Sequence, residues 1–287
     1  MMRSYILGFL SLCLPLSFAS AGELSGTLKR ISDSGQINLG YRVSEAPMSF
    51  HDPNGNPVGY SIDLCNLIAT AVKQKLSQPE IKINYLPVTA ETRFDAIVSG
   101  KIDLLCGATT KTLKRSERVG FSQLTFATGG SLLSLKETEV NGVSALAGKK
   151  VAVVANTTTI ETLKAVVKKQ LVDVKIVPVS DAANGMKMLD SGEVNAFASD
   201  QVVLIGQVIA RNSGKEYALS KQLFSFEPFA LALARGDADF RLAVDRVLSQ
   251  VNRTRHIRKI YAKWFGRFGE KPSPALLALF QLNATPE

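Results

Sequence analysis

Short strand-like and helix-like segments alternate along the first half of the chain, and this alternation restricts the fold more than any single motif does. Residues 37–41 and 81–88 alternate apolar and polar side chains, as strands do, and 102–106 is a compact apolar run typical of a buried strand. Helical spacing of apolar residues lies between these runs, in a segment that ends near Lys75 and again over 93–98. This order predicts a mostly parallel sheet with crossover helices, in the α/β class.

A second unit of the same kind follows. Residues 124–133 are extended and contain paired glycines, which suits a strand that passes from one lobe to another. Further strand patterns occur at 150–154, 174–179 and 194–198. Glu227 and Pro228 mark a return crossing to the first lobe. The predicted division is 22–126 plus 228–287 for the first lobe and 127–227 for the second.

The segment 93–122 has the features of an anion site. The strand at 102–106 runs through the small-residue turn 107–110 into a short basic helical segment with Arg115. Backbone N–H groups at such a turn are unpaired and point the same way, so they can bind an anion. A carboxylate fits well, because an arginine can bind both of its oxygens. The alternative is an ordinary strand–turn–helix with a solvated arginine.

Three arginines are expected at the same edge of the first sheet. Arg42 follows the strand at 37–41, Arg93 follows the strand at 81–88, and Arg115 follows the turn that contains Thr109 and Thr110. Ligands of parallel sheets lie beyond the carboxyl ends of the strands. Converging guanidinium groups repel one another unless anions offset their charge, so the sequence predicts an anionic ligand there.

The second unit has polar turns in equivalent places. Thr157 and Thr158 follow the strand at 150–154, and Asp200 follows the strand at 194–198. Each of these side chains could simply cap the helix that follows it. Each could equally face a cleft between the two units.

The N-terminus predicts export. Residues 1–21 have one positive charge, an apolar stretch and the end sequence Ala19-Ser20-Ala21, as a cleavable secretory signal does. Cys13 allows a lipid anchor as an alternative, although Leu12 is large for that motif. We therefore expect a soluble, exported protein cleaved near Ala21. Its net charge of +9 is better explained by anionic small molecules or a membrane-side partner than by nucleic acid. Cleavage leaves Cys65 and Cys106, which could form a disulfide or remain two separate buried thiols.

These motifs together resemble solute-binding proteins family 3, the periplasmic receptors that deliver polar amino acids to ABC importers. The similarity spans roughly residues 37–266 and is nearest to the glutamate/aspartate-binding branch. It includes a block over 59–64 and the closing residues Lys263 to Gly266. The signature core is matched by Arg93, Gly100, Asp103, Gly107, Thr109, Thr110, Arg115, Phe121 and Ser122.

The resemblance implies a type II periplasmic-binding fold, in which two lobes close on a ligand around two hinge crossings. It implies that Arg115 and the backbone of residues 108–110 bind an α-carboxylate, with Ala108, Thr109 and Thr110 as contacts. Asp200, helped by Thr110, would bind the α-ammonium. Thr157 and Thr158 would line the second lobe's side. Arg42 and Arg93 would provide the extra positive charge that an acidic amino acid or a small dicarboxylate requires.

The chain departs from that branch at three positions. Ala90 and Ala108 stand where the branch has small hydroxyl residues, and Ala182 stands where it has a histidine. The resemblance further implies an ABC permease in the inner membrane as partner, a monomer, and no cofactor. No sequence motif for a zinc site or a phosphate-binding loop occurs.

Three alternatives remain open. The first is a periplasmic enzyme on the same scaffold, similar to cyclohexadienyl dehydratase, with Glu45 or Glu91 as general acid. The second is a receptor for another small carboxylate. The third is a stand-alone extracytoplasmic sensor. The tail from Lys271, which has two prolines and a leucine-rich stretch, is expected to be loosely attached.

Overall fold

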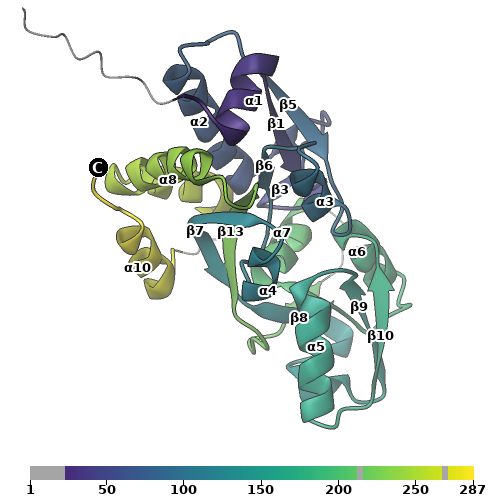
Figure 1. The fold of residues 1–287 in the computed structure, drawn as a ribbon. Coiled ribbons are helices and arrows are strands. Elements are labelled where there is room, and N and C mark those ends of the chain that lie inside the picture. Colours follow the sequence, from purple (N-terminus) through teal and green to yellow (C-terminus); the bar gives the residue numbers. More distant parts are fainter. Residues whose placement is uncertain (1–22, 212–215, 267–270) are drawn as a thin grey trace, which may run out of the picture.

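A computed structural model describes residues 23–211, 216–266 and 271–287; the expected signal sequence lies outside these ranges. Two five-stranded sheets, each flanked by helices, form the two ends of an elongated molecule (Figure 1). In spatial order the first sheet contains β5 (Lys82–Pro87), β1 (Gln36–Tyr41), β6 (Leu104–Cys106), β13 (Glu227–Leu233) and β7 (Gly120–Thr128). The second contains β10 (Val174–Val179), β9 (Lys149–Val154), β11 (Ala196–Asp200), β8 (Gly130–Leu135) and β12 (Tyr217–Leu219).

The remaining elements divide between the lobes. A small three-stranded sheet is formed by β2 (Ser44–Glu45), β3 (Ser49–His51) and β4 (Pro57–Val58). The helices of the first lobe are α1 (Gly26–Ser34), α2 (Tyr60–Lys75), α3 (Arg93–Val98), α4 (Leu113–Ser116), α8 (Ala238–Arg253), α9 (His256–Phe265) and α10 (Pro274–Leu282). Those of the second are α5 (Thr158–Lys169), α6 (Ala182–Asp190), α7 (Gln201–Ala210) and two 3₁₀ turns, η1 (Lys136–Thr138) and η2 (Val143–Leu146).

The strand directions confirm the α/β class that the alternation predicts. Strand β1 pairs in parallel with β5 and β6, and β9 pairs in parallel with β10 and β11. In the two five-stranded sheets the antiparallel pairs all contain β7, β8 or β13, the strands next to the crossings: β13 pairs with β6 and β7, and β8 pairs with β11 and β12. Parallel strands end at one edge of a sheet, so the turns after them gather on the side that faces the other lobe.

The chain passes between the sheets twice. Strand β7 leaves the first sheet at Thr128 and β8 enters the second at Gly130, while β12 ends at Leu219 and the chain returns in β13 at Glu227. A Cβ on Gly129 would lie 2.4 Å from the Ser225 carbonyl oxygen, so the two crossings are in direct contact. We propose that the lobes divide at these crossings, and the division at 126/127 and 227/228 stays a prediction.

The core of the first lobe contains a cluster of aromatic rings. Phe126 stacks on Phe265 with centroids 5.2 Å apart, and Tyr60 meets both rings edge-on. Tyr60 is fully buried and its hydroxyl donates to the Thr125 carbonyl, so the start of α2 is fixed to β7. The cluster therefore packs α2 and α9 against β7, the strand that leads into the first crossing.

The C-terminal tail corrects one prediction. Residues 274–282 form α10, whose Leu276 and Phe280 are buried, and Phe280 contacts the ring of Tyr261. The tail is therefore packed on the first lobe instead of being loosely attached. Cys65 on α2 and Cys106 at the end of β6 form a disulfide with a Cα–Cα distance of 6.3 Å, which settles the alternative that the sequence left open.

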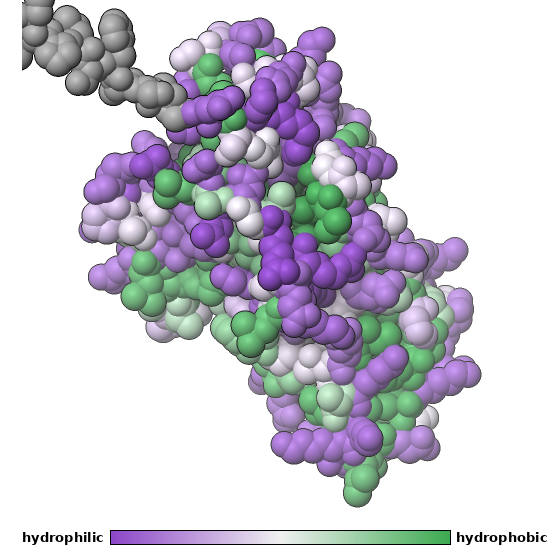
Figure 2. Space-filling model, viewed as in Figure 1, coloured by the Kyte–Doolittle hydropathy of each residue, from purple (hydrophilic) through white to green (hydrophobic). Residues whose placement is uncertain are grey.

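Hydrophilic residues cover most of the face seen in Figure 2. Within the described ranges, every helix is too short or too polar to cross a membrane.

Candidate functional site

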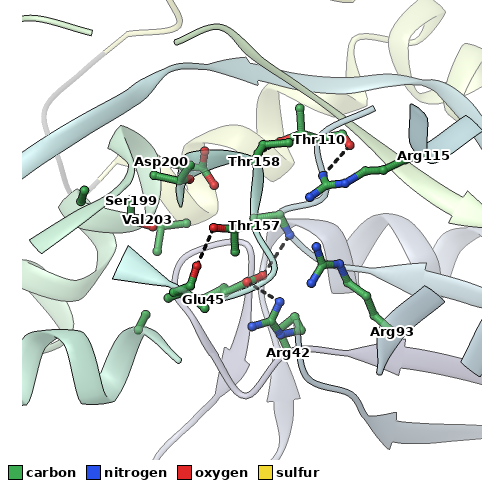
Figure 3. A pocket seen from close by; sticks show the side chains of 15 residues that line it. Arg42, Glu45, Arg93, Thr110, Arg115, Thr157, Thr158, Ser199, Asp200 and Val203 are labelled. Carbon is green, nitrogen blue, oxygen red and sulfur yellow. Dashed lines mark hydrogen bonds and ion pairs between the residues drawn. The ribbon is translucent and has the colours of Figure 1, made fainter. Parts of the chain in front are cut away.

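The candidate site is a pocket between the two lobes (Figure 3). Strands β1 and β6 of the first lobe and β9 and β11 of the second all end beside it, so the polar residues just beyond them line one space. The cavity measures about 30 Å³. That is room for no more than a few water molecules, so a larger ligand can enter only if the lobes separate.

The first lobe contributes three arginines, and each already has a protein partner. Arg42 Nη1 lies 2.8 Å from Glu45 Oε1, and Arg115 Nη1 donates to the Thr110 carbonyl at 2.8 Å. Arg93 donates to the carbonyl of Ala90 through Nη1, and through Nη2 to the carbonyl of Asn156 in the second lobe, at 3.0 Å. The guanidinium groups of Arg93 and Arg115 also lie against the Phe94 ring. Figure 3 shows the three guanidinium ends gathered along one side of the pocket.

The electrostatics of these arginines reflect crowding in a buried place. Burial, followed by the neighbouring charges of Arg115 and Arg42, lowers the pKa of Arg93 to about 9. Burial also lowers the pKa of Arg115, against the opposing influence of Glu227 and Asp200. The first lobe's side of the pocket is thus a set of cations held close together against their mutual repulsion, and added negative charge would stabilise it.

Asp200, at the end of β11, faces these arginines from the second lobe (Figure 3). The residue as a whole is only partly buried, but its Oδ1 is buried and has no hydrogen-bond partner among the described residues. Burial, and then the negative charges of Glu227 and Glu45, raise the pKa of Asp200 well above its usual range. A buried carboxyl oxygen without a donor is costly, and a cationic ligand group would remove that cost.

Hydroxyl groups join the lobes at the top of the pocket. Thr158 Oγ1 lies 3.3 Å from Thr110 Oγ1 and donates to Glu227 Oε2 at 2.8 Å, while Thr110 Oγ1 donates to the same oxygen at 2.6 Å. Thr157 caps α5 by accepting from the Ile160 amide, as its alternative interpretation predicts, and it also lines the pocket. Asp200 precedes α7 but makes no side-chain cap, so capping does not explain its place.

The structure brings together all but one of the predicted contacts. Thr109 does not line the pocket, and its carbonyl instead accepts from the Ala230 amide of β13. The other predicted residues line it: Arg42, Arg93, Ala108, Thr110, Arg115, Thr157, Thr158 and Asp200. Their individual roles toward a ligand stay predictions.

Two carboxylates at the site were not predicted as ligand contacts. Glu45 lines the pocket and accepts from the Ala108 amide at 3.2 Å, and Glu227 is buried at the hinge beneath Thr110 and Thr158. Glu45 is three residues beyond Arg42, and Glu227 begins the return crossing. These positions in the sequence could have indicated that both carboxylates lie near the site. No group of three or more side chains able to hold a metal ion occurs within the described ranges.

Residues 37–267 match the family model of bacterial extracellular solute-binding proteins, family 3. The chain belongs to this family. A family 3 relative, the L-glutamate/L-aspartate-binding protein of Pseudomonas aeruginosa, is 35% identical over 246 residues, which cover 85% of this chain and 82% of the relative. The glutamate/aspartate import solute-binding protein of Escherichia coli K12 is 29% identical over 268 residues, 92% of this chain and 89% of that protein.

Solved structures agree with this assignment. An ancestral amino acid-binding protein, described as a precursor of cyclohexadienyl dehydratase, superposes with a TM-score of 0.71 at 27% identity, covering 84% of this chain and all of the other. The two-lobed type II periplasmic-binding fold of family 3 is thereby confirmed, and this chain is a solute-binding protein of the amino acid ABC transporter class.

Proposed function

We propose that this family 3 protein is the periplasmic receptor of an ABC importer and binds one acidic amino acid or small dicarboxylate between its lobes. The observation that carries the proposal is the unpartnered, buried Oδ1 of Asp200 opposite the three arginines. A ligand with one ammonium and two carboxylates matches one anion facing several cations. The curated relatives named as glutamate/aspartate-binding proteins support the same ligand class.

The proposed pose uses both lobes. Arg115 and the backbone at residues 108–110 bind the α-carboxylate, and Asp200 with Thr110 binds the α-ammonium. Arg42 and Arg93 face the second carboxylate. Because the groups for the two ends of the ligand lie on different lobes, closing the lobes is what completes the site.

Three alanines stand where receptors of the acidic-ligand branch have side-chain donors, so the ligand cannot be held here by all the contacts that those receptors use. Ala182 and Ala108 line the pocket without offering a side-chain donor, and Ala90 is buried beside it. A hydrogen bond to a charged group contributes about 1.5–3 kcal/mol, so three absent donors lower the affinity for glutamate considerably. The proposed ligand class therefore includes acidic ligands that differ in shape from glutamate.

The proposal includes the surroundings of the receptor. Residues 1–21 would direct export and be removed near Ala21. The mature protein would act as a monomer and deliver its ligand to an inner-membrane permease, without binding nucleic acid. It would need no cofactor of its own, since a receptor of this kind only binds and releases the ligand.

A thermal-shift screen over the proteinogenic amino acids and small dicarboxylates tests the proposal. We expect glutamate, aspartate or a dicarboxylate to raise the unfolding temperature most, because ligands that bind only the folded state stabilise it. Calorimetry should then give one site per chain. Stabilisation by neutral or cationic amino acids alone would overturn the ligand assignment.

A dehydratase-like enzyme is the second candidate. The observation in its favour is that Glu45, a possible general acid, lines the pocket. Of the two proposed acids, Glu45 lines the pocket, whereas Glu91 is exposed and does not. Glu45 Oε1 is paired with the Arg42 cation and Oε2 accepts from the Ala108 amide, which is unlike a general acid that must donate a proton to substrate. Turnover of a cyclic carboxylic acid during incubation with the protein would favour the enzyme.

A further inference from the structure

Glu45 places a carboxylate inside the pocket, where a ligand's carboxylate would be expected. Its side chain is 12% exposed, and that of its partner Arg42 is 6% exposed. Oε1 lies 2.8 Å from Arg42 Nη1, and Oε2 accepts from the Ala108 amide at 3.2 Å. Figure 3 shows this carboxylate between Arg42 and the backbone of the first lobe. The protein thus supplies its own anion to two donors of the site.

These two donors are also the ones that an acidic ligand needs. In the proposed pose, the Ala108 amide helps to bind the α-carboxylate and Arg42 faces the second carboxylate. A backbone amide has a single hydrogen to donate, so Glu45 and the ligand cannot both receive it fully. Arg42 has five N–H donors and could contact two carboxylates, but these would then lie next to each other and repel.

The backbone around Glu45 is fixed from both lobes, so the residue cannot withdraw by a loop movement alone. The Arg42 amide donates to Ser49 Oγ at 2.9 Å and Ser49 Oγ donates to the Arg42 carbonyl at 3.0 Å. From the second lobe, Gln207 Nε2 donates to the Ser44 carbonyl at 2.7 Å. In the closed arrangement, Glu45 can leave the donors only by rotating its side chain.

The charge of Glu45 acts on the whole pocket. It favours the charged forms of Arg93 and Arg115, and it adds to the rise in the pKa of Asp200. Three arginines therefore face two carboxylates along the pocket lining, Glu45 and Asp200. The excess of positive charge available to a ligand is smaller than the arginines alone would give.

We propose that Glu45 is a specificity-determining residue: an internal competitor that weakens the binding of acidic ligands by occupying Arg42 and the Ala108 amide. The inference rests on the proposed function of the same pocket. A ligand with a second carboxylate has to displace Glu45 or lie beside it. A neutral ligand of the same shape leaves the Arg42–Glu45 pair in place.

The test compares glutamate and glutamine, which differ by one charge and little in shape, by isothermal titration calorimetry. The variants are Glu45→Gln and Glu45→Ala, with Glu91→Gln as a control that removes one charge from an exposed residue outside the pocket. We expect both Glu45 variants to bind glutamate about tenfold more tightly or better than the control, since one like charge nearby is removed. Glutamine affinity should change much less.

Each outcome separates the inference from the proposed function. If wild-type protein binds glutamate and the Glu45 variants bind it equally or more weakly, the inference is wrong while the receptor for acidic ligands stands. If only the Glu45 variants bind glutamate, the competitor is confirmed and the assigned natural ligand is wrong. If neither wild type nor variants bind any acidic ligand, both proposals are overturned.

Discussion

The two sides of the pocket differ in how their buried charged groups are paired. On the first lobe, each arginine has a protein acceptor: Glu45 for Arg42, the carbonyls of Ala90 and Asn156 for Arg93, and that of Thr110 for Arg115. On the second lobe, Asp200 has a buried oxygen with no partner among the described residues. The charges of the first lobe are therefore already paired within the protein, whereas the carboxyl of the second lobe needs a partner from the ligand.

This difference indicates where ligand binding gains most. The arginines of the first lobe already have acceptors in the protein, so a new bond from one of them to a ligand replaces part of an existing interaction. A ligand ammonium at Asp200 replaces nothing and removes the penalty of an unpaired polar atom. We therefore expect substitution of Asp200 to have the largest effect, with Arg115 next because it is assigned to the ligand's α-carboxylate.

Asp200→Asn should cost about 2–5 kcal/mol of binding free energy, because it keeps the shape while deleting the charge that pairs with the ammonium. The free protein should not lose stability. Because burial raises the pKa of Asp200, the folded protein at neutral pH bears the cost of burying this charge or of taking up a proton to neutralise it, and asparagine has no such cost. Calorimetry together with thermal unfolding separates these effects, and a variant with normal affinity would remove Asp200 from the site.

The same carboxyl predicts a pH dependence. Pairing with an ammonium requires ionised Asp200, whose pKa is raised in the free protein, so binding releases a proton. Affinity should therefore rise with pH through the pKa of Asp200 and level off above it. Asp200→Asn should abolish this dependence over the same range.

Arg115→Ala should lose a similar amount, about 2–5 kcal/mol, because it removes a partly desolvated partner of the α-carboxylate. It also removes a donor to the Thr110 carbonyl, so circular dichroism is needed to show that the fold persists. Normal ligand affinity in this variant would contradict the receptor model of the pocket altogether.

Gly206→Ala tests whether ligand binding requires the lobes to close. Gly206 lies at a contact between the lobes but does not line the pocket. A Cβ at Gly206 on α7 would lie 2.1 Å from the Ala46 carbonyl oxygen of the first lobe. Such a clash opposes closure and should weaken ligand binding by about 1–3 kcal/mol. Gly266→Ala, where nothing lies within 4 Å, is the matched control. Small-angle scattering should show wild type and control contracting on ligand and Gly206→Ala contracting less.

If closure is not part of binding, Gly206→Ala will bind as the control does. We expect a rotation on the order of tens of degrees about residues 125–130 and 225–229. An unchanged radius of gyration in wild type at saturating ligand would contradict that expectation directly.

The sequence predicted the fold and the membership of the pocket because both depend on local order. Strand ends bring Arg42, Arg93 and Asp200 together whenever the sheets form, and apolar periodicity shows the strands. The tail was predicted wrongly for an equally local reason. Two prolines near Lys271 favour an irregular chain, yet Pro274 stands in the first turn of α10 behind the capping Ser273, where proline is compatible with a helix.

The partners of the charges could not be predicted in this way. Glu45 lies only three residues beyond Arg42, but its contact with the Ala108 amide arises because β2 lies against the turn after β6, which no periodicity reveals. Glu227 meets Thr158 only because the return crossing lies against the second lobe. The sequence therefore named three arginines and one aspartate as ligand contacts, named Glu45 only as a possible general acid, and did not identify Glu227 as part of the site.

Arg42→Ala has the smallest expected effect. It distinguishes a role of Arg42 in binding the ligand from a role only in holding Glu45. If Arg42 binds the ligand's second carboxylate, its removal should cost about 1–2 kcal/mol with glutamate and much less with glutamine. Part of that loss would come from Glu45, whose charge would remain in the pocket without its ion-pair partner. The double variant Arg42→Ala/Glu45→Ala should therefore recover some glutamate affinity, and a double-mutant cycle measures the coupling. Equal affinity of wild type and Arg42→Ala for glutamate would mean that Arg42 serves only to hold Glu45, and the acidic ligand would then depend on Arg93 and Arg115 alone.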